Sequence, residues 1–188
     1  MTRARAGDLA AFNALVEMHQ DVVYGLCLRM LASTHAAEDV AQDVFLAAYR
    51  RIESYRGGVF RAWLLRIATN ACIDELRRRQ RRPQFSLDDT IGDAPAFDLP
   101  DESESPEDRV LRGELSAYLQ ASLMALPPDQ RATIVLCDVQ GLSYEEASQA
   151  LGISLGTVKS RLSRGRARLR DILLRQRELL PRQFRHID

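Results

Sequence analysis

Apolar side chains recur every three or four residues over most of the first 80 positions, a spacing that predicts helices rather than strands. Asp8 can cap the first helix, and Thr34 can cap a second helix over Ala36–Ile52. The apolar positions of the first helix are Phe12, Leu15, Val16, Val22, Val23, Leu26, Met30 and Leu31. A core of packed helices therefore begins near the N-terminus.

A glycine-bearing loop at Glu53–Val59 precedes a third long helix, Phe60–Arg79, which Pro83 stops. Residues 83–106 contain four prolines amid small and acidic residues, and the stretch from Ser86 to Asp108 has nine acidic residues and no basic one. Such a segment buries too little apolar surface to offset its ordering entropy, so a flexible linker is expected.

Helical spacing resumes over Pro106–Ala125, breaks at Pro127–Pro128 and continues through Asp129–Val139. Nothing alternates as a strand does. We therefore predict an all-α protein made of two small helical domains and a flexible acidic linker. The expected boundaries are 1–82, the linker 83–106, 107–178, and a C-terminal tail at 179–188.

The stretch Gly141–Arg170 has the pattern of a helix-turn-helix. Ser143 and Glu146 form a capping box, Gly152 ends the first helix, and Ser154 caps the second. Leu142, Ala147, Ala150 and Leu151 give the first helix its apolar stripe, and Val158, Leu162 and Leu169 give the second its inner face. Outward positions are expected for Lys159, Ser160, Arg161, Ser163, Arg164 and Arg168.

A helix that carries these donors suits guanine edges and phosphates, so duplex DNA is the expected partner. The alternative is a solvated basic helix that closes a helical bundle. Charge distribution favours the first interpretation, because the net charge is zero while basic residues concentrate in Arg77–Arg82 and Lys159–Arg185.

Other functional groups are scattered along the chain. Cys27, Cys72 and Cys137 lack the spacing of a zinc site or a disulfide framework, and buried thiols are expected. The three histidines form no catalytic or metal-binding constellation. With no signal peptide and no membrane-spanning run, we expect a cytoplasmic protein without metal or cofactor.

The second predicted helix has a polar face formed by Asp39, Gln42, Asp43 and Leu46 at i, i+3, i+4 and i+7. The opposite stripe contains Val40, Val44, Phe45 and Ala48, which suit a core. By itself such a polar face is ordinarily exposed to solvent.

The third helix carries Trp63, Arg66, Asn70, Asp74 and Arg77 along one stripe. Rings that stack, amides that bond base edges and arginines that hold the backbone suit unpaired bases. The preceding Tyr55, Arg56, Gly57 and Gly58 form a loop that could enclose an extruded base. Trp63 could equally be a core residue.

Two stretches of this chain resemble a known family. EDVAQDVFLAAYRRIESYRGGVFRAWLLRIATNACIDELRRRQRR is similar to region 2 of the extracytoplasmic-function sigma factors, and LPPDQRATIVLCDVQGLSYEEASQALGISLGTVKSRLSRGRARLR is similar to their region 4. The resemblance covers about Phe12–Leu173, outside the linker and the two ends.

The resemblance implies three sets of site residues. The set for docking on the β′ clamp helices of core RNA polymerase is Asp39, Gln42, Asp43 and Leu46. The set for capturing the melted −10 element is Tyr55, Arg56, Gly57, Gly58, Phe60, Trp63, Arg66, Asn70, Asp74 and Arg77. The set for reading the −35 duplex is Thr157, Lys159, Ser160, Arg161, Ser163, Arg164 and Arg168.

The resemblance also implies a non-enzymatic initiation factor, monomeric when free. Its partners would be core polymerase (through β′ and the β subunit), promoter DNA and an anti-sigma factor. In this family the linker threads polymerase channels; a competing hypothesis has the linker fold back on the basic helices. Two other classes stay open: an autonomous helix-turn-helix regulator that acts without polymerase, and a DNA-processing enzyme, for which no nucleophile or metal cluster is evident.

Overall fold

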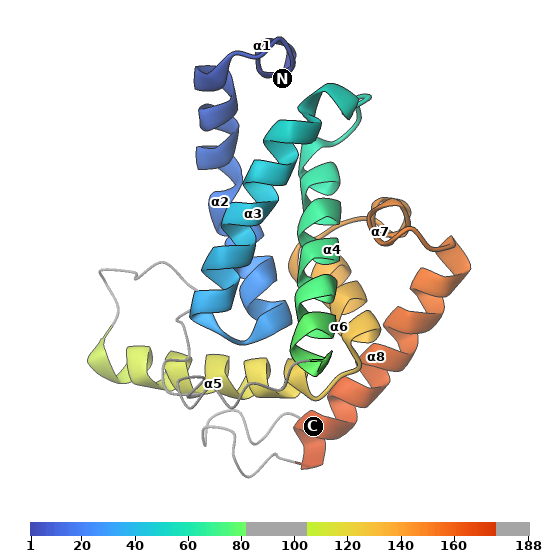
Figure 1. Cartoon of the computed structure of the whole chain (residues 1–188). Coiled ribbons are helices and arrows are strands. Elements are labelled where there is room, and N and C mark those ends of the chain that lie inside the picture. The colour runs from blue at the N-terminus through green and yellow to red at the C-terminus, as the bar shows by residue number, and fades with distance from the viewer. Residues whose placement is uncertain (82–104, 176–188) are drawn as a thin grey trace.

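The computed structural model describes residues 1–81 and 105–175, and within these ranges every regular element is helical (Figure 1). The elements are α1 (Thr2–Arg5), α2 (Leu9–Leu31), α3 (Thr34–Arg51), the 3-10 turn η1 (Ile52–Ser54), α4 (Phe60–Arg81), α5 (Pro106–Met124), α6 (Pro128–Ile134), the π-helical turn η2 (Val135–Val139), α7 (Tyr144–Leu151) and α8 (Leu155–Arg175). The predicted all-α class is confirmed. The linker and tail predictions fall on or largely on residues outside the described ranges.

Side-chain caps fix four of the helix starts, those of α2, α3, α7 and α8. The Asp8 carboxylate accepts the Ala11 N–H at 3.0 Å, and Ser143 and Glu146 form the complete capping box. Gly152 ends α7 in the left-handed conformation, at φ 66°, and Ser154 Oγ accepts the Thr157 N–H at 3.1 Å. The predicted Thr34 cap is wrong, because Ser33 accepts the Ala36 N–H and α3 begins at Thr34, two residues before the expected Ala36.

The N-terminal lobe, residues 1–81, is built on α2, α3 and α4, which pack against one another. Their inward side chains include Leu26, Met30, Val44, Leu64 and Leu65, all at most 1% exposed. Cys27 and Cys72 are fully buried in the same core, as expected, and Cys137 is half-buried. This packing fixes which faces of α3 and α4 are exposed to solvent.

The C-terminal lobe, residues 105–175, contains α5 to α8, with α6 and α7 both packed on α8. Pro127 and Pro128 start α6, but the helix predicted through Val139 changes geometry at Val135. There the chain adopts a π-helical turn, in which the Gln140 N–H donates to the Val135 carbonyl at 2.9 Å. The turn delivers the chain to Gly141 and the helix-turn-helix.

The two lobes pack directly against each other, which the sequence does not predict. Helix α4 contacts α7, and α2 contacts α5, α6 and η2. In Figure 1, α5 runs beneath the lower ends of α2 and α4, while α7 lies beside α4. Buried residues of both lobes form one continuous hydrophobic core.

Candidate nucleic-acid interface

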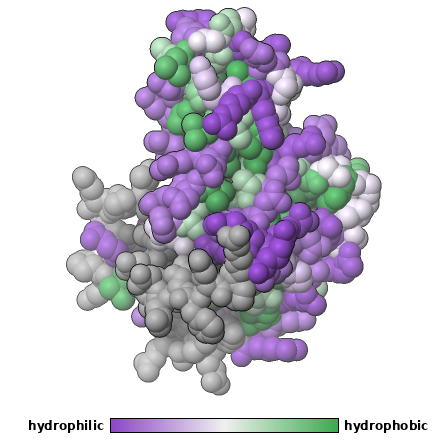
Figure 2. All heavy atoms as spheres, viewed as in Figure 1, coloured by the Kyte–Doolittle hydropathy of each residue, from purple (hydrophilic) through white to green (hydrophobic). Residues whose placement is uncertain are grey.

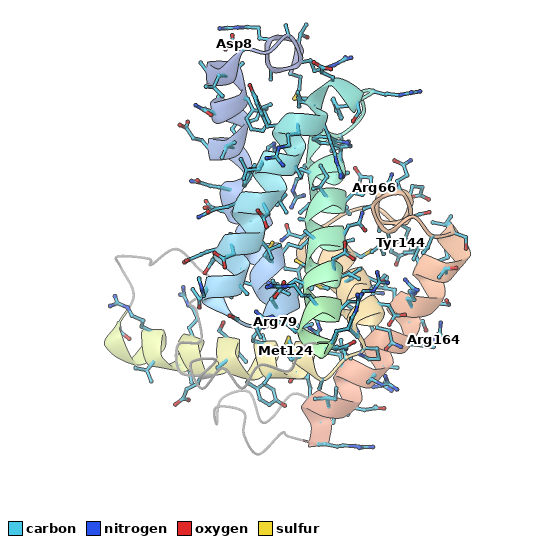
Figure 3. The ribbon with its side chains drawn as sticks, viewed as in Figure 1. Asp8, Arg66, Arg79, Met124, Tyr144 and Arg164 are labelled. Atoms are coloured by element: carbon cyan, nitrogen blue, oxygen red, sulfur yellow. The ribbon has the colours of Figure 1, made fainter. Side chains whose placement is uncertain are left out.

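Helix α8 displays a basic outer surface. Lys159, Ser160, Ser163, Arg164 and Arg168 are all exposed, whereas Val158 and Leu162 are at most 2% exposed and anchor the inner side. Figure 3 shows Arg164 on the side of α8 that faces away from α4. Its guanidinium bonds the carbonyl of Ser160, one turn back, at 3.2 Å. Five of the seven residues predicted to read the duplex are therefore exposed on α8.

Two ion pairs tie α8 to the segment that precedes the helix-turn-helix. Arg161 Nε lies 3.2 Å from Asp129 Oδ2, and Arg166 Nε donates to Asp138 Oδ2 at 3.0 Å. The hydrogen bonds from Arg166 to Asp138 raise the pKa of Arg166 above its usual range. The Arg161 side chain is only 25% exposed, so it is more enclosed than the outward position expected from the sequence.

An open groove of about 520 Å³ runs along α8 beside the start of α7. Its polar and charged lining comes from Tyr144, Lys159, Ser163, Arg166 and Arg170. Sequence reasoning missed Tyr144, Arg166 and Arg170; the i, i+4, i+7 and i+11 spacing from Lys159 could have identified the two arginines. The groove extends the basic surface beyond the predicted residues.

The loop before α4 is closed by an aromatic cluster. Tyr55 is only 6% exposed, and its hydroxyl donates to the Gly58 carbonyl at 2.6 Å. The Tyr55 ring lies 5.6 Å from that of Phe60 and 5.4 Å from that of Trp63, between ring centroids. His19 of α2 completes the cluster at 5.4 Å from Phe60. Trp63 is half-buried. Its position is therefore intermediate between the exposed base-stacking ring and the core residue that the sequence left open.

The backbone of this loop needs glycine. Gly57 and Gly58 adopt φ values of 97° and 93°, which L-residues with side chains rarely adopt. Both glycines are exposed, and so is Arg56, which precedes them. The loop thereby presents backbone and Arg56 to solvent while its aromatic rings pack inward.

The outer face of α4 carries the other residues predicted to read single-stranded DNA. Arg66, Asn70, Asp74 and Arg77 are all exposed, so the structure brings them together on one stripe. Arg77 Nη1 lies 3.4 Å from Asp74 Oδ1. Figure 3 shows Arg66 on the flank of α4 toward α7, and Figure 2 shows a largely hydrophilic visible face.

Near the end of α4, Glu75 is held by two arginines. Its carboxylate lies 2.7 Å from Arg78 Nε and 2.9 Å from Arg79 Nε. Hydrogen bonds from Arg78 and then Arg79 outweigh partial burial and lower the pKa of Glu75. This pairing orders the basic end of the helix while leaving Arg77 and Arg78 exposed.

The predicted polymerase-binding face lies on α3. Asp39, Gln42, Asp43 and Leu46 are all exposed, and Leu46 is an apolar residue with 54% of its surface accessible. Val40, Val44 and Ala48 on the opposite side are buried. Exposed carboxylates with a leucine one turn further along the helix suit a basic partner surface that also offers an apolar contact.

Within the described residues, no group of three or more histidine, cysteine or acidic side chains could hold a metal ion. No helix in these ranges is long and apolar enough to cross a membrane.

Comparisons with known families match both lobes. The family model for sigma-70 region 2 matches residues 15–82, and that for sigma-70 region 4 matches residues 116–169. The first match covers α3, the loop before α4 and α4 itself, and the second covers the helix-turn-helix.

Several characterised relatives are similar over most of this chain. The ECF RNA polymerase sigma factor SigE of Mycolicibacterium smegmatis is 44% identical over 89% of this chain, which spans 64% of the length of that relative. SigW of Bacillus subtilis is 38% identical, covering 91% of this chain and 93% of SigW.

Two solved structures have a similar fold. The sigma factor RpoE in complex with the anti-sigma factor NepR, from Bartonella quintana, aligns with a TM-score of 0.68 at 28% identity, covering 88% of this chain and 98% of that one. CnrH in complex with the cytosolic domain of CnrY aligns with a TM-score of 0.65 at 27% identity, covering 93% and 94% of the two chains.

Proposed function

Because this chain belongs to the extracytoplasmic-function family of RNA polymerase sigma factors, we propose that it binds core RNA polymerase and directs promoter-specific initiation. The observation that carries this proposal is the presence of two exposed surfaces of different chemistry in one chain. An exposed basic helix, α8, suits duplex DNA, and the loop and outer stripe of α4 suit unpaired bases. An autonomous duplex-binding regulator has no use for the second surface.

In the proposed mechanism, α8 binds the −35 element as duplex. Lys159, Arg164 and Arg168 supply phosphate contacts and donors to base edges, because they are exposed on one face. Thr157, Ser160 and Ser163 add hydroxyl groups to that face, and the ion pairs of Arg161 and Arg166 keep the helix in place. The duplex contact positions the N-terminal lobe over the DNA that opens.

The −10 element is then captured as single strand. Bases that leave the stack meet the loop Tyr55–Phe60 and the exposed Arg66, Asn70, Asp74 and Arg77 of α4. Unstacking costs a few kcal/mol per base, and a pocket that binds only the extruded base offsets this cost. The factor performs no chemistry itself, since the polymerase synthesises the RNA.

Partners and location follow from the same assignment. The α3 face with Asp39, Gln42, Asp43 and Leu46 docks on the β′ clamp helices, and the C-terminal lobe contacts the β subunit. Anti-sigma complexes of RpoE and CnrH support an anti-sigma partner for this chain as well. The protein acts in the cytoplasm, where its polymerase is.

The test is run-off transcription with core polymerase and this protein on a library of promoter sequences. We expect initiation at a subset of templates that share two elements, with none from core polymerase alone. If the protein binds duplex sites tightly without polymerase and never directs initiation, the autonomous regulator is correct and the proposal is wrong.

Charge reversal on α3 provides the matched binding test. Asp43→Arg should lower affinity for core polymerase, because it places a cation against a basic partner surface. Glu17→Arg, the same charge reversal at an exposed position on α2, serves as the control. Equal affinity of the two variants for core polymerase would count against the α3 docking face.

A further inference from the structure

The short helix α1 is fixed against the turn that leads into the loop before α4. Ala4 of α1 is fully buried in the same core as Ile52 of η1, and α1 contacts both α2 and η1. Arg3 Nη2 lies 2.7 Å from the Asp8 carboxylate, which holds α1 to the start of α2. In Figure 1, α1 and the turn after α3 accordingly share the upper end of the N-terminal lobe.

This end of the lobe is strongly basic. Two arginines come from α1, two from the end of α3 and one from the loop after η1, and all five are exposed. We call this set the arginine tip, and its members are Arg3, Arg5, Arg50, Arg51 and Arg56. Because α1 packs on η1, segments that are about 45 residues apart in the chain contribute to one charged surface.

The nearby carboxylates leave most of this charge without a counterion. Asp8 is already engaged, because it accepts the Ala11 N–H and a hydrogen bond from Arg3, and both contacts lower its pKa. Glu53 of η1 is the other acidic residue in segments 1–8 and 50–56. Within the described residues, the four arginines other than Arg3 form no ion pair with a described side chain. An anionic partner would therefore be attracted to the tip.

The arginine tip adjoins the surface proposed for unpaired bases. The Tyr55 N–H donates to the Ile52 carbonyl at 3.2 Å, so η1 and the loop form one continuous unit. The loop leads directly into α4, whose exposed stripe includes Arg66 and Arg77. A strand with one base held in the loop has phosphates on both sides of that base. The stripe of α4 supplies cations on one side of the loop, and the tip supplies them on the other.

We propose that the arginine tip binds the phosphate backbone of the unpaired DNA strand beyond the captured −10 base. Helix α1 is then part of the single-strand binding site. Guanidinium groups suit this ligand, since they can bond two phosphate oxygens at once. The inference rests on the function proposed above.

The charge pattern of α3 favours DNA over polymerase as the partner of the tip. The exposed carboxylates Asp39 and Asp43 lie in the first half of α3, and Arg50 and Arg51 lie at its end. A basic polymerase surface that accepts these carboxylates would repel the arginines. A phosphate backbone has the opposite preference, so the two ends of α3 suit two different partners.

The test measures binding of single-stranded DNA by the holoenzyme formed from core polymerase and this protein. One labelled oligonucleotide carries the −10 element alone, and a longer one adds several nucleotides on each side. The variant is Arg5→Gln with Arg51→Gln, which removes two charges of the tip outside the loop. The matched control is Arg109→Gln with Arg175→Gln, exposed arginines of α5 and α8. Circular dichroism checks that each variant is folded.

The expected result is a smaller salt dependence for the longer oligonucleotide. Each phosphate contact to a single strand contributes about 0.7 to the slope of log affinity against log salt, so the double variant should lose about 1.4. Between about 50 and 200 mM salt, the wild type should then lose roughly sevenfold more affinity than the variant. Arg5→Lys with Arg51→Lys should keep the wild-type slope, because it keeps both charges. All proteins should bind the short oligonucleotide equally.

Two results would overturn the arginine tip as a DNA surface. One is a double variant whose salt dependence on the longer oligonucleotide equals that of the control. The other is a double variant that binds core polymerase more weakly while its salt dependence on DNA is unchanged, which would assign the tip to polymerase. If the wild-type holoenzyme binds neither oligonucleotide, the proposed capture of the −10 strand is itself wrong, and the inference fails with it.

Discussion

The two surfaces proposed to read DNA are built in opposite ways. On α8 five of the seven predicted readers are exposed, and two ion pairs and buried apolar residues fix the helix beneath them. In the loop before α4, Tyr55 and its neighbours pack inward on one another. A duplex has a fixed shape, so side chains held on a rigid helix suit it. An extruded base instead needs a surface that can rearrange around it. The comparison teaches that the surface proposed to read the −35 duplex is already displayed on a fixed helix, whereas the aromatic rings of the loop proposed to capture −10 bases pack against one another.

The largest expected effect comes from disturbing the support of α8. A Cβ on Gly165 would lie 2.9 Å from Ile134 Cδ1 and 3.4 Å from Gln130 Cβ, because α8 crosses α6 closely there. Gly165→Leu should destabilise the C-terminal lobe by about 3 kcal/mol through overpacking. Thermal unfolding measures this, with Gly113→Leu on α5, where nothing lies within 4 Å, as the control. Equal melting of both variants would show that α8 does not depend on this close crossing.

The next largest effect concerns binding of duplex DNA by the exposed side chains of α8. Arg164→Ala should weaken −35 duplex binding by about 1–3 kcal/mol if the guanidinium makes a bidentate base contact. Titration of a labelled −35 duplex measures the change, and Arg175→Ala at the end of α8 is the control. Asn70→Ala on α4 should leave this binding intact and block promoter opening. If Arg164→Ala binds as the control does, the duplex is read elsewhere.

A smaller effect is expected from loosening the closed loop. Tyr55→Phe keeps the ring contacts but removes the hydrogen bond to the Gly58 carbonyl. The closed conformation of the loop should lose about 1 kcal/mol of stability. Promoter opening, followed by the fluorescence of a base analogue in the −10 element, should change while −35 binding does not. Tyr49→Phe, an exposed tyrosine on α3, is the control. Unchanged opening in Tyr55→Phe would mean that loop closure is unimportant for base capture.

The smallest effect is a pH dependence of the aromatic cluster. Burial, followed by the nearby Arg61 charge, lowers the pKa of His19 in the folded protein. The unfolded chain therefore takes up the proton first as pH falls below about 6.5, and stability decreases toward acid. The melting temperature should fall from pH 7.5 to pH 5.5 by more in the wild type than in His19→Gln. Parallel curves would remove His19 from this role.

Local sequence chemistry accounts for much of the fold. Asp8, Ser143 and Ser154 each cap a helix as predicted, because a side-chain oxygen beside the first free N–H groups acts over a few residues. The cap of α3 is one residue off because Ser33 and Thr34 both carry a hydroxyl group and the sequence does not distinguish them. Helix periodicity likewise placed Arg66, Asn70, Asp74 and Arg77 together on the exposed side of α4, and it placed Asp39, Gln42, Asp43 and Leu46 on that of α3.

Long-range contacts were beyond such reasoning. Gln120 and Arg131 read as ordinary polar positions, yet each is at most 9% exposed and bonds a carbonyl about 90 to 100 residues earlier in the chain. The burial of Tyr55 depends on how the loop closes over α4, which no local pattern specifies. The roles assigned to the individual site residues stay predictions until they are measured.

The π-helical turn at Val135–Val139 has a geometric consequence for the whole reader. In an α-helix each residue advances the chain by about 100° around the axis, so one extra residue in a wide turn is a phase shift of that size. Gln140 and the helix-turn-helix follow this turn, and their angular setting against the N-terminal lobe includes the shift. Deleting one residue from this turn would leave the composition and the helix almost unchanged. The helix-turn-helix would nevertheless be rotated by about 100° relative to the N-terminal lobe.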